Sequence, residues 1–168
     1  GNVFLNLGNV FENWNEPDSA KKYYNLSLEE HEQSALKHGS VYSYINLTSV
    51  YLSLNELKTA QEHGEKGLEL ATEINHLDGK QKVAEQLSKV YKKLGKWELA
   101  STTYELFINT RDSLKRKENQ KATILQETKY ALRKKELHDS IQRANKDAMT
   151  KLEMEKLDAE LQEGRVFI

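Results

Sequence analysis

The sequence contains no cysteine, so five histidines are the nitrogen ligands that could hold a transition metal together with carboxylates. They are His31, His38, His63, His76 and His138. A helical zinc site needs two histidines one turn apart with a carboxylate between them, and no pair here has that spacing. A phosphate-binding loop, a nucleophile elbow and a paired-acid motif are also missing from the sequence. We therefore predict no catalytic residue, no metal site, no cofactor and no enzyme activity, and we interpret the histidines as surface or inter-helix joint residues.

Small and aromatic residues, by contrast, recur at intervals of 40 positions. The recurring sets are Leu7, Leu47 and Leu87; Phe11, Tyr51 and Tyr91; and Ala20, Ala60 and Ala100. Each copy reads as two amphipathic helices joined by a turn, which falls at residues 15–18, at residues 55–56 and at Gly95. One helical hairpin cannot bury its apolar face alone, whereas stacked hairpins share a continuous core. The repeat therefore predicts an all-α fold, an α-solenoid of three helical hairpins.

The spacing within each copy resembles the tetratricopeptide repeat. The residues that carry the resemblance in the first copy are Leu7, Gly8, Phe11, Ala20, Tyr24 and Leu28. We expect three such units over residues 1–116, divided at about residues 1–39, 40–79 and 80–116. The interval of 40 exceeds the usual 34 of the family, so we expect the extra length in longer helices and in joints near Gly39 and Gly79.

The composition changes after the third unit and predicts a long charged helix over residues 117–163. Neither glycine nor proline occurs between Glu98 and Glu163, although Asp112, Ser113 or Asn119 could cap a new helix at a break. One apolar face has the spacing of a coiled coil and is our predicted dimerisation surface: Leu137, Ile141, Ala144, Ala148 and Leu152. Other apolar residues shift out of that frame: Leu125 and Leu132 fall in a second frame, and Met154, Leu157 and Leu161 in a third.

The first helix of each hairpin lines a concave wall in the family that the repeat resembles. On that wall we expect a peptide-binding groove formed by Asn6, Asn9, Tyr42, Asn46, Ser49, Lys82, Gln86 and Lys89. Asparagine side chains can hydrogen-bond the backbone of an extended peptide. The alternative is that these residues form an ordinary solvated face.

The family also contains a carboxylate clamp that holds the C-terminal acid of chaperone tails. Asn9, Asn46 and Lys82 match the clamp, whereas Leu5 and Gln86 stand where it has lysine and arginine. Two charges are therefore missing from a site that works by charge-assisted hydrogen bonds.

The net charge of -1 gives no electrostatic case for nucleic acid as a partner. We predict a non-catalytic protein-protein interaction scaffold that binds a peptide or helix. The alternative is a homodimerisation module that works through the long helix and has no peptide ligand.

Repeats followed by a charged helix resemble the sensor halves of bacterial regulators, so we expect a piece of a larger bacterial signalling or regulatory protein. Residues 164–168 form a tail that turns apolar, and we expect a membrane contact only if a span follows Ile168. The bacterial cytoplasm and the periplasm both stay open as the compartment.

Overall fold

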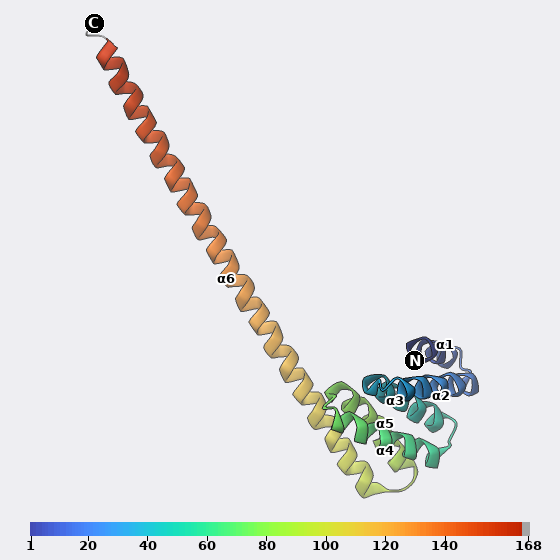
Figure 1. Ribbon diagram of the computed structural model, residues 1–168. Coiled ribbons are helices and arrows are strands. Elements are labelled where there is room, and N and C mark those ends of the chain that lie inside the picture. Colours follow the sequence, from blue (N-terminus) through green and yellow to red (C-terminus); the bar gives the residue numbers. More distant parts are fainter. Residues whose placement is uncertain (166–168) are drawn as a thin grey trace. The chain divides into compact units, whose positions relative to one another are not determined.

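The computed structural model describes the backbone of residues 1–165 and the side chains of residues 1–162. In this part of the chain all regular structure is helical, in six helices (Figure 1). They are α1 (Asn2–Asn13), α2 (Pro17–Gln33), α3 (Lys37–Ser53), α4 (Leu57–Glu73), α5 (Leu77–Lys93) and α6 (Trp97–Arg165). Three helical hairpins and a long C-terminal helix confirm the predicted all-α solenoid.

Five short turns separate these helices, and all five close in the same way. In the first turn Asn15 N–H donates to the carbonyl of Glu12, and Glu16 N–H donates to the carbonyl of Phe11. This pair of bonds is a Schellman motif, which needs a left-handed residue just after the helix. That residue is Asn15 (φ 59°), Ala35 (53°), Asn55 (61°), Asn75 (52°) or Gly95 (71°). The 40-residue repeat therefore consists of two halves, each a 17-residue helix and a three-residue turn.

Gly39 and Gly79 do not lie in joints, which corrects the expectation from the sequence. Gly39 lies in the first turn of α3 and Gly79 in the first turn of α5. A Cβ atom on Gly39 would lie 2.6 Å from the ring of His31, and one on Gly79 would lie 2.5 Å from Val41 Cγ1. Both glycines therefore allow helices to approach closely, and the hairpins are separated by turns at residues 34–36 and 74–76.

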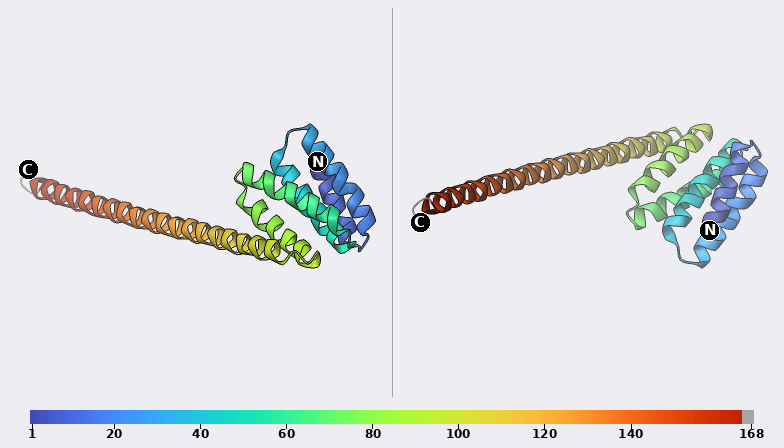
Figure 2. Two further views of the ribbon diagram at one scale, coloured as in Figure 1. Left: turned by 90° about the horizontal axis from the view of Figure 1, so that it is seen from below. Right: turned by 90° about the horizontal axis from the view of Figure 1, so that it is seen from above.

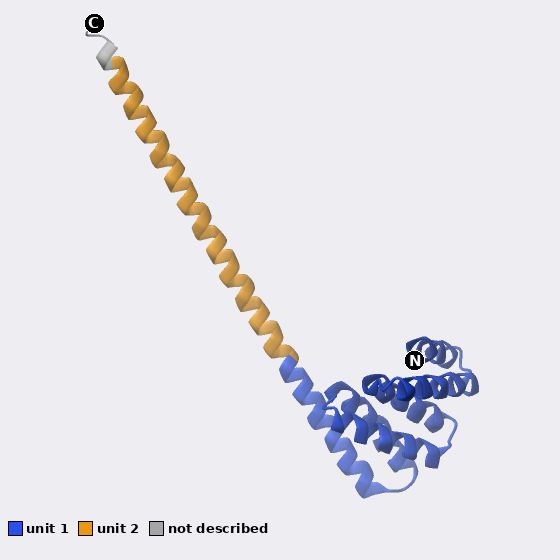
Figure 3. Cartoon of the chain, viewed as in Figure 1, with its two compact units in different colours: residues 1–117 blue, residues 118–168 orange. Residues whose placement is uncertain are grey.

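Residues 1–117 form one compact unit whose successive helices pack side by side (Figures 2 and 3). One core cluster joins α2 to α3 and contains Ala20, Tyr24, Leu28, Tyr44, Leu47 and Val50. A second cluster joins α3, α4 and α5 and contains Val41, Ile45, Ala71 and Val83. Each cluster spans neighbouring hairpins, so the solenoid is stabilised by the stacking of its hairpins rather than by any hairpin alone.

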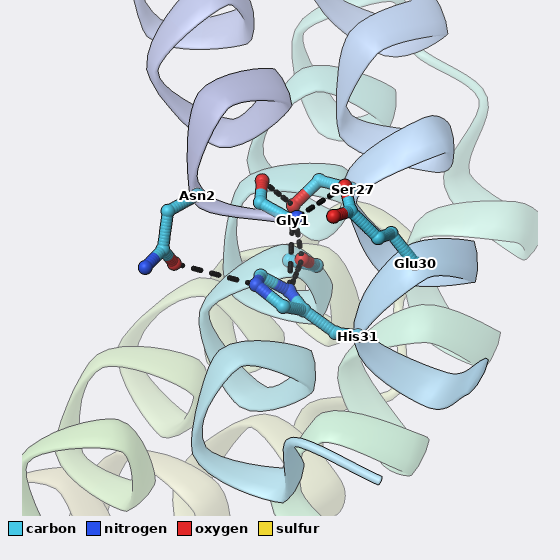
Figure 4. Close-up of polar contacts among 6 residues, drawn as sticks. Gly1, Asn2, Ser27, Glu30 and His31 are labelled. Carbon is cyan, nitrogen blue, oxygen red and sulfur yellow. Dashed lines mark hydrogen bonds and ion pairs between the residues drawn. The ribbon is translucent and has the colours of Figure 1, made fainter. Parts of the chain in front are cut away.

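A buried polar cluster ties α1, α2 and α3 together at one end of the first hairpin (Figure 4). His31 is 1% exposed, and its Nδ1 lies 3.1 Å from Ser43 Oγ while its Nε2 lies 3.3 Å from Asn2 Oδ1. Ser27 Oγ lies 2.9 Å from Ser43 Oγ. Burial lowers the pKa of His31 below its ordinary value. Our interpretation of His31 as a surface or joint residue is therefore wrong, because it is a core residue that hydrogen-bonds neighbouring helices.

Residues 118–168 are the second compact unit (Figure 3). Helix α6 is continuous from Trp97 to Arg165, without a break at Asp112, Ser113 or Asn119. Its Ala, Leu, Lys, Glu and Gln content favours an uninterrupted helix. Residues 166–168 of the predicted tail lie outside the described part of the chain.

Candidate functional site

The candidate site is the wall formed by the first helix of each hairpin, within residues 1–117. Helix α3 contacts both α1 and α5, so the three helices are neighbours. The eight predicted groove residues fall at three positions of the 40-residue repeat: Tyr42 and Lys82; Asn6, Asn46 and Gln86; and Asn9, Ser49 and Lys89. Because equivalent positions of stacked repeats share one face, the repeat itself aligns these side chains.

Asn9 and Asn46 meet across the α1–α3 boundary. Asn46 Nδ2 donates a hydrogen bond of 3.0 Å to Asn9 Oδ1, which also accepts a bond of 2.8 Å from Tyr24 Oη. Tyr24 Oη lies 2.6 Å from Glu12 Oε2 as well. Burial, together with the bond to Glu12, raises the pKa of Tyr24 well above its ordinary value. The Asn9 oxygen is thus already engaged.

A second polar group connects α3 to α5. Tyr42 Oη donates a hydrogen bond of 2.9 Å to Asp78 Oδ2, and Lys82 Nζ lies 2.9 Å from the same oxygen. Lys82 Nζ also lies 5.3 Å from the centre of the Tyr42 ring, within cation–π range. Burial alone would raise the pKa of Asp78, but the bonds from Lys82 and Tyr42 hold it below its ordinary value. The carboxylate is therefore kept ionised, and it neutralises Lys82.

Two histidines extend this group toward the start of α3. The rings of His38 and His76 are 4.8 Å apart, edge to face, and the His76 ring is 5.4 Å from that of Tyr42. Burial, reinforced by the nearby His38, lowers the pKa of His76. A cavity of about 560 Å³ opens beside them and is lined in part by Asn2, His38 and Tyr42. The site therefore has an aromatic and imidazole end as well as the predicted amides.

Three residues of the site were not predicted from the sequence: His38, His76 and Asp78. A usable signal was present, because His38 and Asp78 are 40 residues apart and so occupy the same position of the repeat. They also lie four residues before Tyr42 and Lys82, which is one helical turn.

Comparison with known proteins agrees with this architecture. A family model described as a tetratricopeptide repeat matches residues 2–31. Residues 2–31, which cover α1 and most of α2, therefore resemble a tetratricopeptide repeat. The crystal structure of the tetratricopeptide repeat domain of Arabidopsis FLU has a similar fold, with a TM-score of 0.63 and 17% sequence identity. That match covers 66% of this chain and 93% of the FLU domain, and at this identity it shows the fold alone. A search of curated protein sequences gave no match.

The family match and the solved structure both concern tetratricopeptide repeats, and they support the all-α solenoid fold of this chain. Of its predicted groove residues, the structure joins Asn9 to Asn46 and Tyr42 to Lys82. The other four do not join this pair of clusters. Asn6 is exposed, Ser49 and Gln86 are half-buried, and Lys89 is paired with Glu85 on its own helix at 2.7 Å.

The predicted dimerisation residues all lie exposed on α6, within the second unit. Leu137 is 63% exposed, Ile141 51% and Leu152 47%, and Ala144 and Ala148 are also exposed. Their spacing places them on one face of the helix.

The described residues contain no group of three or more histidines and carboxylates placed to hold a metal ion. In the same part of the chain, no helix of the repeats or of α6 is both long and apolar enough to cross a membrane.

Proposed function

We propose that the α1–α3–α5 wall binds a peptide segment of a partner protein. One observation supports this most directly: residues from three hairpins meet on one face as two ordered polar clusters, Asn9–Asn46 and Tyr42–Asp78–Lys82. Ordered side chains lose little conformational entropy when a ligand binds, which favours affinity.

The chemistry of the wall favours an extended main chain over a terminal carboxylate. Amide groups such as those of Asn6 and Asn46 hydrogen-bond a peptide backbone without requiring one sequence. Lys82, in contrast, is already neutralised by Asp78 at 2.9 Å. The carboxylate clamp therefore lacks a free cation at the one lysine that matches it.

Selection of binders from a random peptide library on the intact chain tests this proposal. The affinity of the selected peptides is then measured by fluorescence anisotropy on wild type and on the double variant Asn46→Ala/Lys82→Ala. Loss of two groove contacts is expected to weaken binding about tenfold or more. The matched control is Lys58→Ala, at an exposed lysine of α4 outside the wall.

Peptides that bind both variants as tightly as wild type would show that the wall is not the binding surface. Each selected peptide is also expected to bind equally well with a free C-terminal carboxylate and with an amidated C-terminus, because the wall is proposed to hold the peptide main chain and not its terminus.

We propose homodimerisation through α6 as a second function, since its apolar face at Leu137, Ile141 and Leu152 is exposed along the helix. An isolated amphipathic helix gains most of its stability by burying such a face. Sedimentation equilibrium of the full chain against Leu137→Glu/Ile141→Glu tests it. Lys146→Glu, on the opposite side of the helix, is the control. A chain that is monomeric at high micromolar concentration would exclude the dimer.

We further propose that this scaffold acts within a bacterial signalling protein, since its repeats lead directly into a charged helix. Determining the sequence of the parent protein on both sides of residues 1–168 tests this proposal. The expected finding is a histidine kinase or a DNA-binding output, and a parent without a regulatory output would contradict the proposal.

A further inference from the structure

The outer face of the third hairpin is uncovered in the described part of the chain. In the first two hairpins, this face of the second helix is packed by the next hairpin, α2 by α3 and α4 by α5. On the third hairpin the corresponding surface is a cavity of about 660 Å³ between α5 and the start of α6. It is lined by Glu85, Ser88, Lys89 and Lys92 of α5 and by Trp97, Ala100, Ser101, Tyr104 and Phe107 of α6. We call these residues the end face.

Equivalent positions show that the end face has the geometry of a helix-docking surface. Phe107 corresponds to Ser27 and Gly67, at intervals of 40 residues. Ser27 Oγ lies 2.9 Å from Ser43 on α3, and a Cβ atom on Gly67 would lie 3.2 Å from Val83 Cγ2 on α5. At both sites the next helix packs directly on this position. On α6 Trp97 and Tyr104 remain 66% and 53% exposed instead.

The charge of the end face specifies what kind of helix fits it. Tyr24 donates hydrogen bonds to Asn9 and Glu12, and the equivalent tyrosine, Tyr104, has Lys89 and Lys92 at those two positions. Two acceptors are thus replaced by two ammonium groups. Lys89 is paired with Glu85, but Lys92 is exposed and lines the same cavity as Tyr104. An occupant must therefore bring carboxylates together with an apolar stripe.

One segment of this chain has that chemistry. Met154, Leu157 and Leu161 form an apolar stripe on α6 and are 66%, 56% and 60% exposed. They lie in a different frame from the predicted coiled-coil face, so a dimer formed through that face leaves them unused. Glu153 and Asp158 flank the stripe on its two sides.

We propose that the end face of one copy binds the acidic helical segment of residues 150–161 of a second copy. The stripe fills the space beside Tyr104 and Phe107, and the flanking carboxylates accept hydrogen bonds from Lys92 and the tyrosine hydroxyl. This contact shares only Lys89 with the predicted groove residues, and it does not depend on the two polar clusters of the wall.

A synthetic peptide of residues 148–162, labelled at its N-terminus, is the probe. The receptor is the full chain carrying Leu157→Glu/Leu161→Glu, so that its own segment does not compete. Anisotropy should show saturable binding that Lys92→Glu or Phe107→Glu weakens about tenfold or more, while Asn46→Ala leaves it unchanged. Lys92 is exposed, so reversing its charge with Lys92→Glu should leave the fold intact. This variant therefore tests the proposal even if Phe107→Glu disturbs folding. A control peptide with Glu153 and Asp158 both changed to Lys should bind at least tenfold more weakly.

Sedimentation velocity of the full chain gives the second readout. The Leu137→Glu/Ile141→Glu background removes the proposed coiled-coil contact, so the self-association that remains there should be lost when Lys92→Glu is added. If Leu137→Glu/Ile141→Glu alone abolishes all self-association, the dimer is assigned to the coiled-coil face and the proposal is overturned. A wild-type chain that stays monomeric, or a peptide that binds the Lys92→Glu receptor equally well, would overturn it too.

Discussion

Ala35 is the one non-glycine, non-asparagine residue at the left-handed turn position, and its replacement by glycine should stabilise the repeats. Its φ of 53° costs an alanine about 1–2 kcal/mol, because Cβ approaches the carbonyl oxygen. Glycine relieves this cost but adds unfolded-state entropy worth about 0.4–1 kcal/mol. The free energy of unfolding should therefore rise by roughly 0.5–1 kcal/mol for Ala35→Gly. Gly95→Ala should lower it by a similar amount, since a Cβ there meets no described atom within 4 Å and only the φ of 71° opposes it.

Urea unfolding followed by tryptophan fluorescence measures both changes in the full chain. Trp14 and Trp97 both lie in residues 1–117, so the signal reports the repeats and not the rest of α6. With a slope of about 2 kcal/mol per molar urea, the midpoints should move by about 0.3–0.5 M in opposite directions. Ser34→Gly is the matched control, because Ser34 has a φ of -88° and glycine there brings only the entropic cost. If Ala35→Gly lowers the midpoint as Ser34→Gly does, left-handed strain does not govern these turns.

Three further outcomes are expected. Gly8→Ala should lower the free energy of unfolding by about 1 kcal/mol, because its Cβ would lie 2.3 Å from the buried ring of Tyr24 and this overlap outweighs the gain in helix propensity; urea unfolding checks it. The pKa of His31 is lower in the folded chain than its ordinary value of 6.5, so the stability that its neutral form contributes is complete above pH 6.5 and is lost as the pH falls through the folded pKa. His31→Gln should therefore reduce the loss of unfolding free energy between about pH 7.5 and 5, as measured by urea unfolding. Tyr42→Phe should raise the pKa of Asp78 by removing a hydrogen-bond donor, as a carboxyl NMR titration would show.

The fold was predictable because one interval of 40 residues repeats three times with the same small and aromatic types. The 20-residue interval between successive helices could not be predicted, because the residues at the five turns differ. Asparagine, alanine or glycine occupies the same left-handed position. The position of Gly39 in a joint was predicted wrongly for a related reason. A glycine near an expected helix end predicts a stop, yet this one makes room for His31 of the preceding helix, and no local pattern encodes that contact.

The candidate site was predicted less completely than the fold. The repeat placed Asn9 and Asn46 on one wall, and the structure joins them by a hydrogen bond. The sequence does not indicate that Asp78 would be held between Tyr42 and Lys82, because that contact depends on the lateral offset between α3 and α5. Periodicity specifies a face, whereas the pairing of side chains across two helices depends on how the helices pack.

Packing between small and large residues also explains why the solenoid ends in an exposed surface. In the first hairpin Tyr24 fills the space above Gly8, and in the second Thr48 lies against Gly64, with the large and small positions exchanged. The third hairpin has Ser88 and Tyr104 at these positions, so neither residue is a glycine. A side chain on the first helix leaves less room for the tyrosine ring, which stays half exposed next to Phe107. Tyr104 and Phe107 therefore form the aromatic surface that we propose a partner helix covers.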